Sequence, residues 1–106
     1  MMSLMLLTAT LNAHAVTTMG DRSCGNWIKS KEDKQQSNGT QWMLEATNHT
    51  WLAGYLSGLS VAMNKDFLKT VDGDSIFLWV DNYCRENPLK TVADAAMNLM
   101  FELTKK

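Results

Sequence analysis

The sequence is sparing in the residues that interrupt helices. Among 106 residues there is one proline and there are six glycines. Proline and glycine are the residues least compatible with a helix interior, so their scarcity leaves room for long uninterrupted elements. No internal repeat and no low-complexity tract is present, which argues against a repeat protein or a disordered linker.

Charge is also scarce. Charged residues make up 20% of the chain and the formal net charge is −1. This balance lacks the basic footprint that nucleic acids or anionic membranes require, so neither is an expected partner. Hydrophobic residues make up 45%, including four tryptophans, which is enough to build a packed core. The length corresponds to one domain.

The first fifteen residues differ from the rest. Residues 1–11 are apolar and uncharged, and Ala13-His14-Ala15 has the small-x-small pattern of a signal-peptidase site. The apolar run is shorter than the roughly 20 residues that span a bilayer. We therefore expect residues 1–15 to be a cleaved signal peptide and residues 16–106 to be a single exported domain. The alternative is an N-terminal helix of a cytosolic protein, since the usual basic n-region is missing.

The chain has two cysteines, Cys24 and Cys84. In an oxidising compartment they are the only pair available for a disulfide. Such a bond closes a loop of about 60 residues and stabilises the fold by about 4 kcal/mol in the chain-entropy model. The alternative is a pair of buried free thiols in a cytosolic protein. Neither cysteine lies in a C-x-x-C motif, so metal binding and redox catalysis are not indicated.

Apolar periodicity predicts an all-α fold, a small bundle of four to five helices with no strand. Helices are expected over residues 24–31, 41–62 and from Asp74 or Ser75 to Asn87, with a break near residues 48–50. The clearest face has the spacing i, i+3, i+4, i+7, i+8 and consists of Ile76, Trp79, Val80, Tyr83 and Cys84. A last helix is expected from Pro88, with Asn87 as its N-cap and an apolar stripe of Leu89, Val92, Ala96, Leu99 and Leu103.

Two glycines interrupt the second helix at a spacing of four, Gly54 and Gly58. Each costs a helix about 1 kcal/mol relative to alanine, so a packing gain should offset them. The expectation is close approach of another helix backbone. A dimer contact is the alternative.

No catalytic motif is apparent. His49 is the one histidine left after signal cleavage, and neither a nucleophile elbow, a zinc motif nor a phosphate-binding loop occurs. Asp72-Gly73-Asp74 lacks the remaining ligands of a calcium loop. We expect no enzyme activity, no cofactor and no metal. A small exported helical domain of this kind is expected to act by binding protein.

The arrangement of motifs resembles one known family. Residues 51–58 (WLAGYLSG), residues 79–89 (WVDNYCRENPL), Ala95-Ala96 and Glu102-Leu103 follow in the order found in the Rap/Tai immunity proteins of type VI secretion systems. Cys24 with Trp27 is similar to the opening helix of that family. The resemblance covers most of residues 24–103.

The resemblance implies a periplasmic helical protein with an HdeA-like fold. Members of the family neutralise a secreted effector, typically a peptidoglycan amidase, by occluding its active site, and several form homodimers. An HdeA-type acid-stress chaperone and an exported envelope factor are the alternatives. The surfaces left for a partner are the loops 31–42 and 64–74, where Trp42 and Phe67 are candidate anchors beside Asp66 and Lys69.

Overall fold

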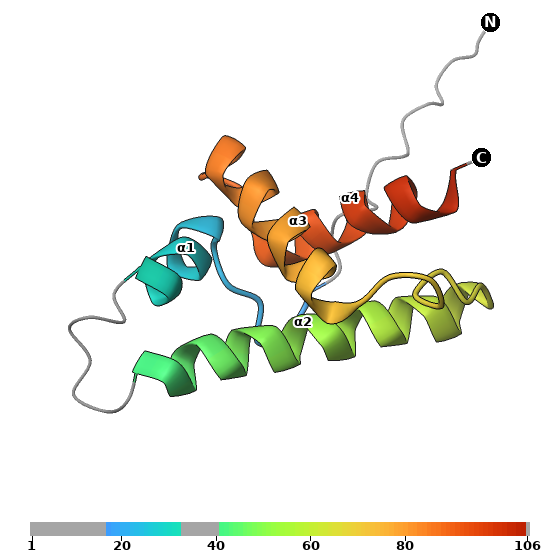
Figure 1. Ribbon diagram of the computed structural model, residues 1–106, viewed down its shortest axis with the longest axis horizontal. Coiled ribbons are helices and arrows are strands. Elements are labelled where there is room, and N and C mark those ends of the chain that lie inside the picture. The colour runs from blue at the N-terminus through green and yellow to red at the C-terminus, as the bar shows by residue number, and fades with distance from the viewer. Residues whose placement is uncertain (1–16, 33–40, 106) are drawn as a thin grey trace, which may run out of the picture.

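The structure is a computed structural model that describes residues 17–32 and 41–105. It contains four helices, α1 (Cys24–Glu32), α2 (Gln41–Met63), α3 (Gly73–Glu86) and α4 (Val92–Thr104). Helix α2 is the longest, and α1, α3 and α4 lie along one side of it (Figure 1). No strand occurs among the described residues, which confirms the all-α prediction. The proposed signal peptide lies outside the described residues.

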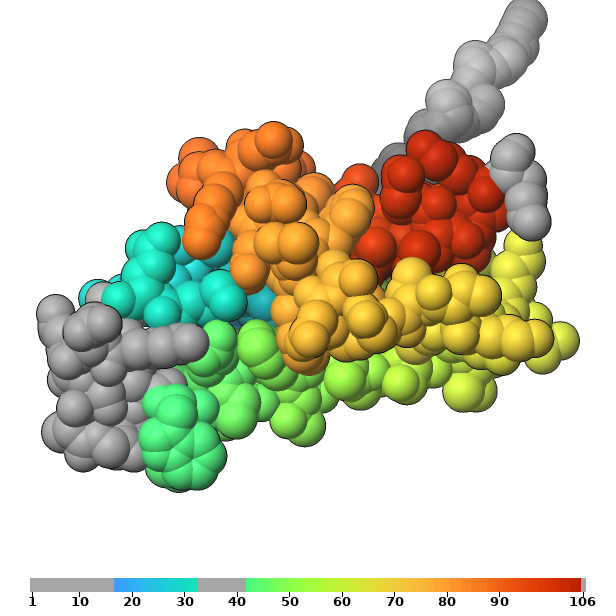
Figure 2. Space-filling model, viewed as in Figure 1, coloured from blue at the N-terminus to red at the C-terminus, as the bar shows by residue number. Residues whose placement is uncertain are grey.

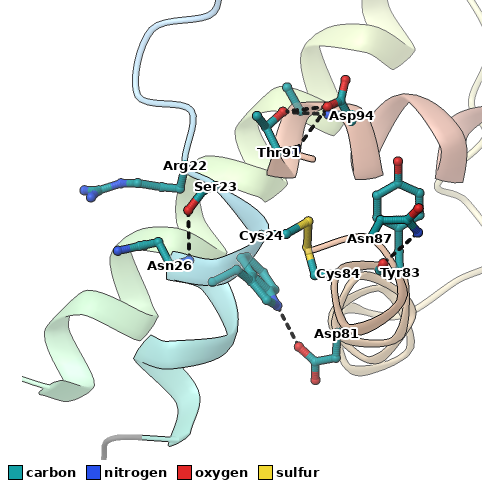
Figure 3. Close-up of a disulfide and its surroundings, with 12 residues drawn as sticks. Arg22, Ser23, Cys24, Asn26, Asp81, Tyr83, Cys84, Asn87, Thr91 and Asp94 are labelled. Atoms are coloured by element: carbon teal, nitrogen blue, oxygen red, sulfur yellow. Dashed lines mark hydrogen bonds between the residues drawn. A yellow bond between two sulfur atoms is a disulfide. The ribbon is translucent and has the colours of Figure 1, made fainter. Parts of the chain in front are cut away.

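The predicted disulfide is present. Cys24 at the start of α1 is bonded to Cys84 near the end of α3, with their Cα atoms 4.8 Å apart (Figure 3). Ser23 caps α1, since its hydroxyl accepts a hydrogen bond from the Asn26 backbone N–H at 3.0 Å. The side chain of Trp27, which is 1% exposed, follows on the same face of α1. The bond therefore fixes α1 against α3 over the core.

Helix α2 is continuous, so the predicted break near residues 48–50 is wrong. Asn48 is 4% exposed, and its side-chain amide donates a hydrogen bond of 3.1 Å to the Ser30 hydroxyl of α1. His49 stacks on Phe77 of α3 with ring centroids 3.8 Å apart. These contacts favour a continuous helix here, because Asn48 has a hydrogen-bond partner on α1 and His49 a stacking partner on α3.

The junction between α3 and α4 also differs from the prediction. Asn87 is the C-cap of α3, and its side chain donates to the Tyr83 carbonyl at 2.9 Å. The N-cap of α4 is Thr91, which forms a reciprocal capping box with Asp94. Pro88 therefore precedes the helix by a turn, and Leu89 is 97% exposed instead of belonging to the apolar stripe.

The N-cap of α3 is Asp72 and not Asp74 or Ser75. Its carboxylate accepts a hydrogen bond of 2.8 Å from the Ser75 backbone N–H. Hydrogen bonding from Ser75 lowers the pKa of the Asp72 carboxyl below its ordinary value, because it stabilises the charged form.

The arm before α1 pairs with the segment before α4. The Arg22 carbonyl accepts from the Val92 N–H at 2.8 Å, and Cys24 donates to the Lys90 carbonyl at 2.9 Å. Asp21 adds a side-chain contact, accepting from the Ala93 backbone N–H at 2.9 Å. The arm is therefore fixed to the first turn of α4.

The core lies where the four helices meet. Leu52 and Leu56 of α2 are 0% and 1% exposed, and Val80 of α3 is 0% exposed. The residues of α4 that close this core are Val92, Ala95, Ala96, Leu99 and Met100. Within the described part of the chain, no helix is long and apolar enough to cross a membrane.

Candidate functional site

The first turn of α2 exposes three consecutive large apolar side chains. Trp42, Met43 and Leu44 are 64%, 50% and 46% exposed. Consecutive helical residues point about 100° apart, so exposure of all three means that this end of α2 projects beyond the other helices. Figure 2 shows it at the edge of the molecule, in bright green. The surface has the composition of a protein-binding anchor, in which tryptophan is enriched.

The loop between α2 and α3, residues 64–72, is well fixed. Ser60 in the last turns of α2 accepts from the Lys65 N–H at 3.1 Å, and its hydroxyl donates to the Lys65 carbonyl at 2.7 Å. The candidate anchor Phe67 is 8% exposed and belongs to the core. Its side chain therefore fixes the loop to the core and is not accessible to a partner. The candidates Asp66 and Lys69 are exposed on the loop surface.

A single chain does not bring the candidate binding residues together. Trp42 lies at the start of α2 and the loop carrying Asp66 and Lys69 follows its end. At 1.5 Å per residue, Trp42 and Met63 are separated by about 32 Å along the helix. The candidate binding residues therefore form two separate surfaces on the chain.

A buried polar cluster, which the sequence did not predict, joins three helices. The indole N–H of Trp27 in α1 donates to the Asp81 carboxylate in α3 at 2.7 Å (Figure 3). Lys31 forms ion pairs with Asp81 at 3.3 Å and with Glu45 of α2 at 3.4 Å. Glu45 also lies 3.8 Å from the His49 imidazole one turn along α2. The cluster satisfies polar groups at a helix junction, which is a structural role.

The two carboxylates of this cluster contact the Lys31 ammonium, the Trp27 indole N–H and the His49 imidazole. Asp66 lies beyond the far end of α2 from Glu45 and does not belong to the cluster. Among residues 17–32 and 41–105, no group of three or more acidic, histidine or cysteine side chains could hold a metal.

Two tyrosine hydroxyls have a raised pKa. Partial burial and the nearby carboxylates of Asp21 and Asp94 raise the pKa of Tyr55, and burial together with Asp94 raises that of Tyr83. A raised pKa keeps both phenols protonated at neutral pH. The Tyr83 hydroxyl accepts a hydrogen bond from the Asn98 side-chain amide at 3.4 Å.

Two shallow depressions in the surface lie over the disulfide and on α2. One, of about 370 Å³, lies over the disulfide, with Ile28 and Pro88 among its apolar lining and Arg85 and Glu32 at its charged part. The other, of about 410 Å³, lies on the solvent side of α2 and is lined by Ala46, Thr47, Thr50 and Trp51.

The solvent side of α2 carries no charge. Every exposed side chain described in this helix is uncharged, and its one formally charged residue, Glu45, faces Lys31 and is 16% exposed. Gly54 and Gly58 lie on this side, and a methyl group added to either would meet nothing within 4 Å. The expected close approach of another helix of the same chain is therefore wrong. The sequence signal for this face was the near absence of charge over 23 residues.

The described residues thus present an exposed apolar helix end, a fixed charged loop and an uncharged helix face, all on a disulfide-linked scaffold. In comparisons with known protein families, with curated proteins and with solved structures, nothing matches this chain.

Proposed function

We propose that the protein is an exported immunity-type binding protein that neutralises a secreted effector, a peptidoglycan amidase, by covering its active site without catalysing a reaction. The proposal includes removal of residues 1–15 and residence in the periplasm. The resemblance of residues 24–103 to the Rap/Tai family supplies the effector class. The disulfide is compatible with an oxidising compartment.

The observation that carries the binding role is the exposed first turn of α2. Fully burying a large apolar side chain is worth about 1.5–3 kcal/mol, so leaving Trp42, Met43 and Leu44 in water forgoes several kcal/mol. A partner that covers this turn recovers that free energy. Occlusion then requires only that the bound protein block substrate access, which agrees with a site that has no catalytic grouping.

The experiment is protection from an amidase. Any peptidoglycan amidase encoded beside the gene is directed to the periplasm and expressed with the wild-type protein or with variants, and binding is measured on the purified pair. Wild type should prevent lysis and form a stable complex. Trp42→Ala should weaken binding by roughly 30-fold, the effect of losing a 2 kcal/mol hot spot.

The matched control is Leu89→Ala. Leu89 is 97% exposed, so its truncation also removes exposed apolar surface without touching the core, and binding should not change. Absence of any complex with the wild-type protein would refute the immunity role. Mass spectrometry of the periplasmic protein tests export separately, by showing whether residues 1–15 are removed and the disulfide is formed.

A second function, acid-stress chaperone activity, is favoured by the polar cluster. Asp81 and Glu45 link α1, α2 and α3 through Lys31. Strong acid removes negative charge from the chain as a whole and leaves its lysines and arginines unopposed, and this excess of positive charge loosens a junction that depends on ion pairs. The test is suppression of client aggregation at pH 2, and no suppression at a several-fold excess would reject it.

A further inference from the structure

A further hollow lies on α3, on the side away from the disulfide. It has a volume of about 240 Å³, is more enclosed than the depressions over the disulfide and on α2, and is lined by Trp79, Asn82, Tyr83 and Glu86. The spacing of these residues is i, i+3, i+4 and i+7, which places them on one face of the helix. Figure 3 shows Tyr83 projecting from the opposite side of α3 to Asp81. The hollow is therefore separate from the polar cluster at Asp81.

Two aromatic rings form the apolar part of this hollow. The rings of Trp79 and Tyr83 are stacked, with centroids 5.7 Å apart and planes inclined at 14°. Both residues belong to the apolar stripe of α3 predicted from the sequence, but Val80 and Cys84 of that stripe are buried, whereas Trp79 and Tyr83 are only partly buried. Ring surface is therefore left in the hollow, where a ligand can stack on it.

The polar part of the hollow contains a carboxylate without a counter-charge. Glu86 is the last residue of α3, where the helix dipole already places negative charge, so an acidic side chain is unfavourable there. Among the described residues no cationic side chain pairs with Glu86, because the adjacent Arg85 pairs with Glu32 of α1 at 3.8 Å. The exposed amide of Asn82 lies one turn before Glu86 on the same face. The stability of the chain does not account for an acidic residue at this position.

A second carboxylate adds to the negative charge around the hollow. Burial raises the pKa of Tyr83, and the Asp94 carboxylate of α4 raises it further, so the charge of Asp94 acts at this ring. Asp94 accepts hydrogen bonds from the backbone and hydroxyl of Thr91, which are neutral groups. None of the residues that line the hollow is basic. The electrostatic surroundings of the two rings therefore favour a cation.

A planar cation matches both parts of the hollow. Cations are attracted to the faces of tryptophan and tyrosine rings. A guanidinium group also stacks on such rings and donates two parallel N–H bonds to a carboxylate, whereas an ammonium group is a compact point charge. A volume of 240 Å³ holds about eight groups the size of water, close to the number of non-hydrogen atoms in an arginine side chain. We propose that the hollow receives an arginine side chain of a protein partner, stacked on the Trp79–Tyr83 pair and hydrogen-bonded to Glu86.

The surroundings of the hollow favour a protein as the source of the guanidinium group. Leu78 is one turn before Asn82 on α3 and is 59% exposed, so apolar surface continues beyond the hollow. The end of α3 projects from the molecule on the side away from α2, where a macromolecule can reach it (Figures 1 and 2). Trp42 lies at the start of α2, so this is a second interaction surface, beyond the one in the proposed function.

The site is tested by NMR titration of the isotope-labelled protein with N-acetyl-arginine amide, following the Trp79 indole resonance. Exposed ion pairs and cation–π contacts are individually weak, so the expected dissociation constant is about 10 mM. N-acetyl-citrulline amide has nearly the same shape without the charge, and N-acetyl-lysine amide has the charge without the planar group. Both should bind about fivefold more weakly. No shift with the arginine compound at about 100 mM, or equal binding of either control compound, would overturn the assignment to arginine.

Two variants locate the site, with circular dichroism to verify folding. Glu86→Gln should weaken binding of the arginine compound about fivefold, because it removes the charge and keeps the shape. Asp74→Asn removes an exposed carboxylate at the other end of α3, about 18 Å along the helix, and should leave binding unchanged. Equal effects of the two substitutions would refute the role of Glu86.

The protein source is tested with two blocked tripeptides, Leu-Arg-Leu and Ala-Arg-Ala. The leucine peptide should bind about fivefold more tightly, and Leu78→Ala should remove most of this gain. Equal binding of the two peptides would contradict a protein partner and assign the hollow to a free guanidinium compound. None of these titrations uses an amidase, so failure of the immunity assay and failure of the arginine-site proposal are distinguishable.

Discussion

The contribution of the polar cluster to the free energy of unfolding can be measured by substituting Asp81. Its carboxylate accepts the Trp27 indole N–H at 2.7 Å and pairs with the Lys31 ammonium at 3.3 Å, while Trp27 and Asp81 are 1% and 7% exposed. Asp81→Ala leaves the indole donor buried without its acceptor, which costs about 1–3 kcal/mol. Loss of the Lys31 pair adds less than about 1 kcal/mol, because the lysine is 23% exposed and screened by solvent. The expected loss is about 3 kcal/mol.

Two further substitutions separate these contributions. Asp81→Asn keeps an oxygen acceptor for Trp27 and removes only the ion pair, so it should cost about 1 kcal/mol. Trp27→Phe removes the donor, after which Asp81→Ala should cost less than in the wild-type background. The coupling free energy between the two positions should be about 1–2 kcal/mol.

The assay is urea unfolding at neutral pH with the disulfide intact, comparing midpoints at constant m. For a domain of this size, a loss of 3 kcal/mol corresponds to a fall in Tm of roughly 12 °C or more. Additive effects of Asp81→Ala and Trp27→Phe would refute the inference that the hydrogen bond stabilises the junction of α1 with α3. Equal costs of Asp81→Ala and Asp81→Asn would refute it as well.

Three other predictions concern the scaffold. Reduction of Cys24–Cys84 should lower the free energy of unfolding by about 4 kcal/mol in denaturant titrations, and be slow without denaturant because both residues are at most 1% exposed. Gly54→Ala should raise the free energy of unfolding by about 1 kcal/mol in urea titrations, since alanine favours the helix and the added methyl group meets nothing within 4 Å. Because the Asp72 pKa is lowered from 3.8, its contribution to stability is complete above that value and is lost as pH falls through the lowered pKa. Asp72→Asn, which retains the cap, should therefore lose less stability between pH 5 and pH 2, and an unchanged acid response would contradict this.

Local patterns were sufficient where one helix face determines the outcome. The face containing Val80 and Cys84 was predicted from its spacing, and both residues are buried. The disulfide followed from the presence of only two cysteines. Export, the effector class and the roles of Trp42, Asp66 and Lys69 remain predictions.

Other features depend on contacts that local spacing does not contain. Asn87-Pro88 has the appearance of a helix start, yet the reciprocal bonds of Thr91 and Asp94 place the start later and leave Leu89 in water. The sequence predicts a helix break at Asn48 and His49, because their partners Ser30 and Phe77 lie on other helices and are not visible locally. Trp27 and Asp81 are 54 residues apart in the chain, so no window of sequence shows their bond.

The pairing of the N-terminal arm with the start of α4 has a consequence for when the protein can fold. Asp21 contacts Ala93 across 72 residues, and Cys24 is bonded to Cys84 across 60. As the chain is synthesised, these two contacts of the arm and of α1 therefore cannot form until residues 84 and 93 have been added. Long-range contacts of this kind form late and slowly. Late closure of the fold is compatible with the proposed export, because a chain that is still open can cross a membrane in extended form.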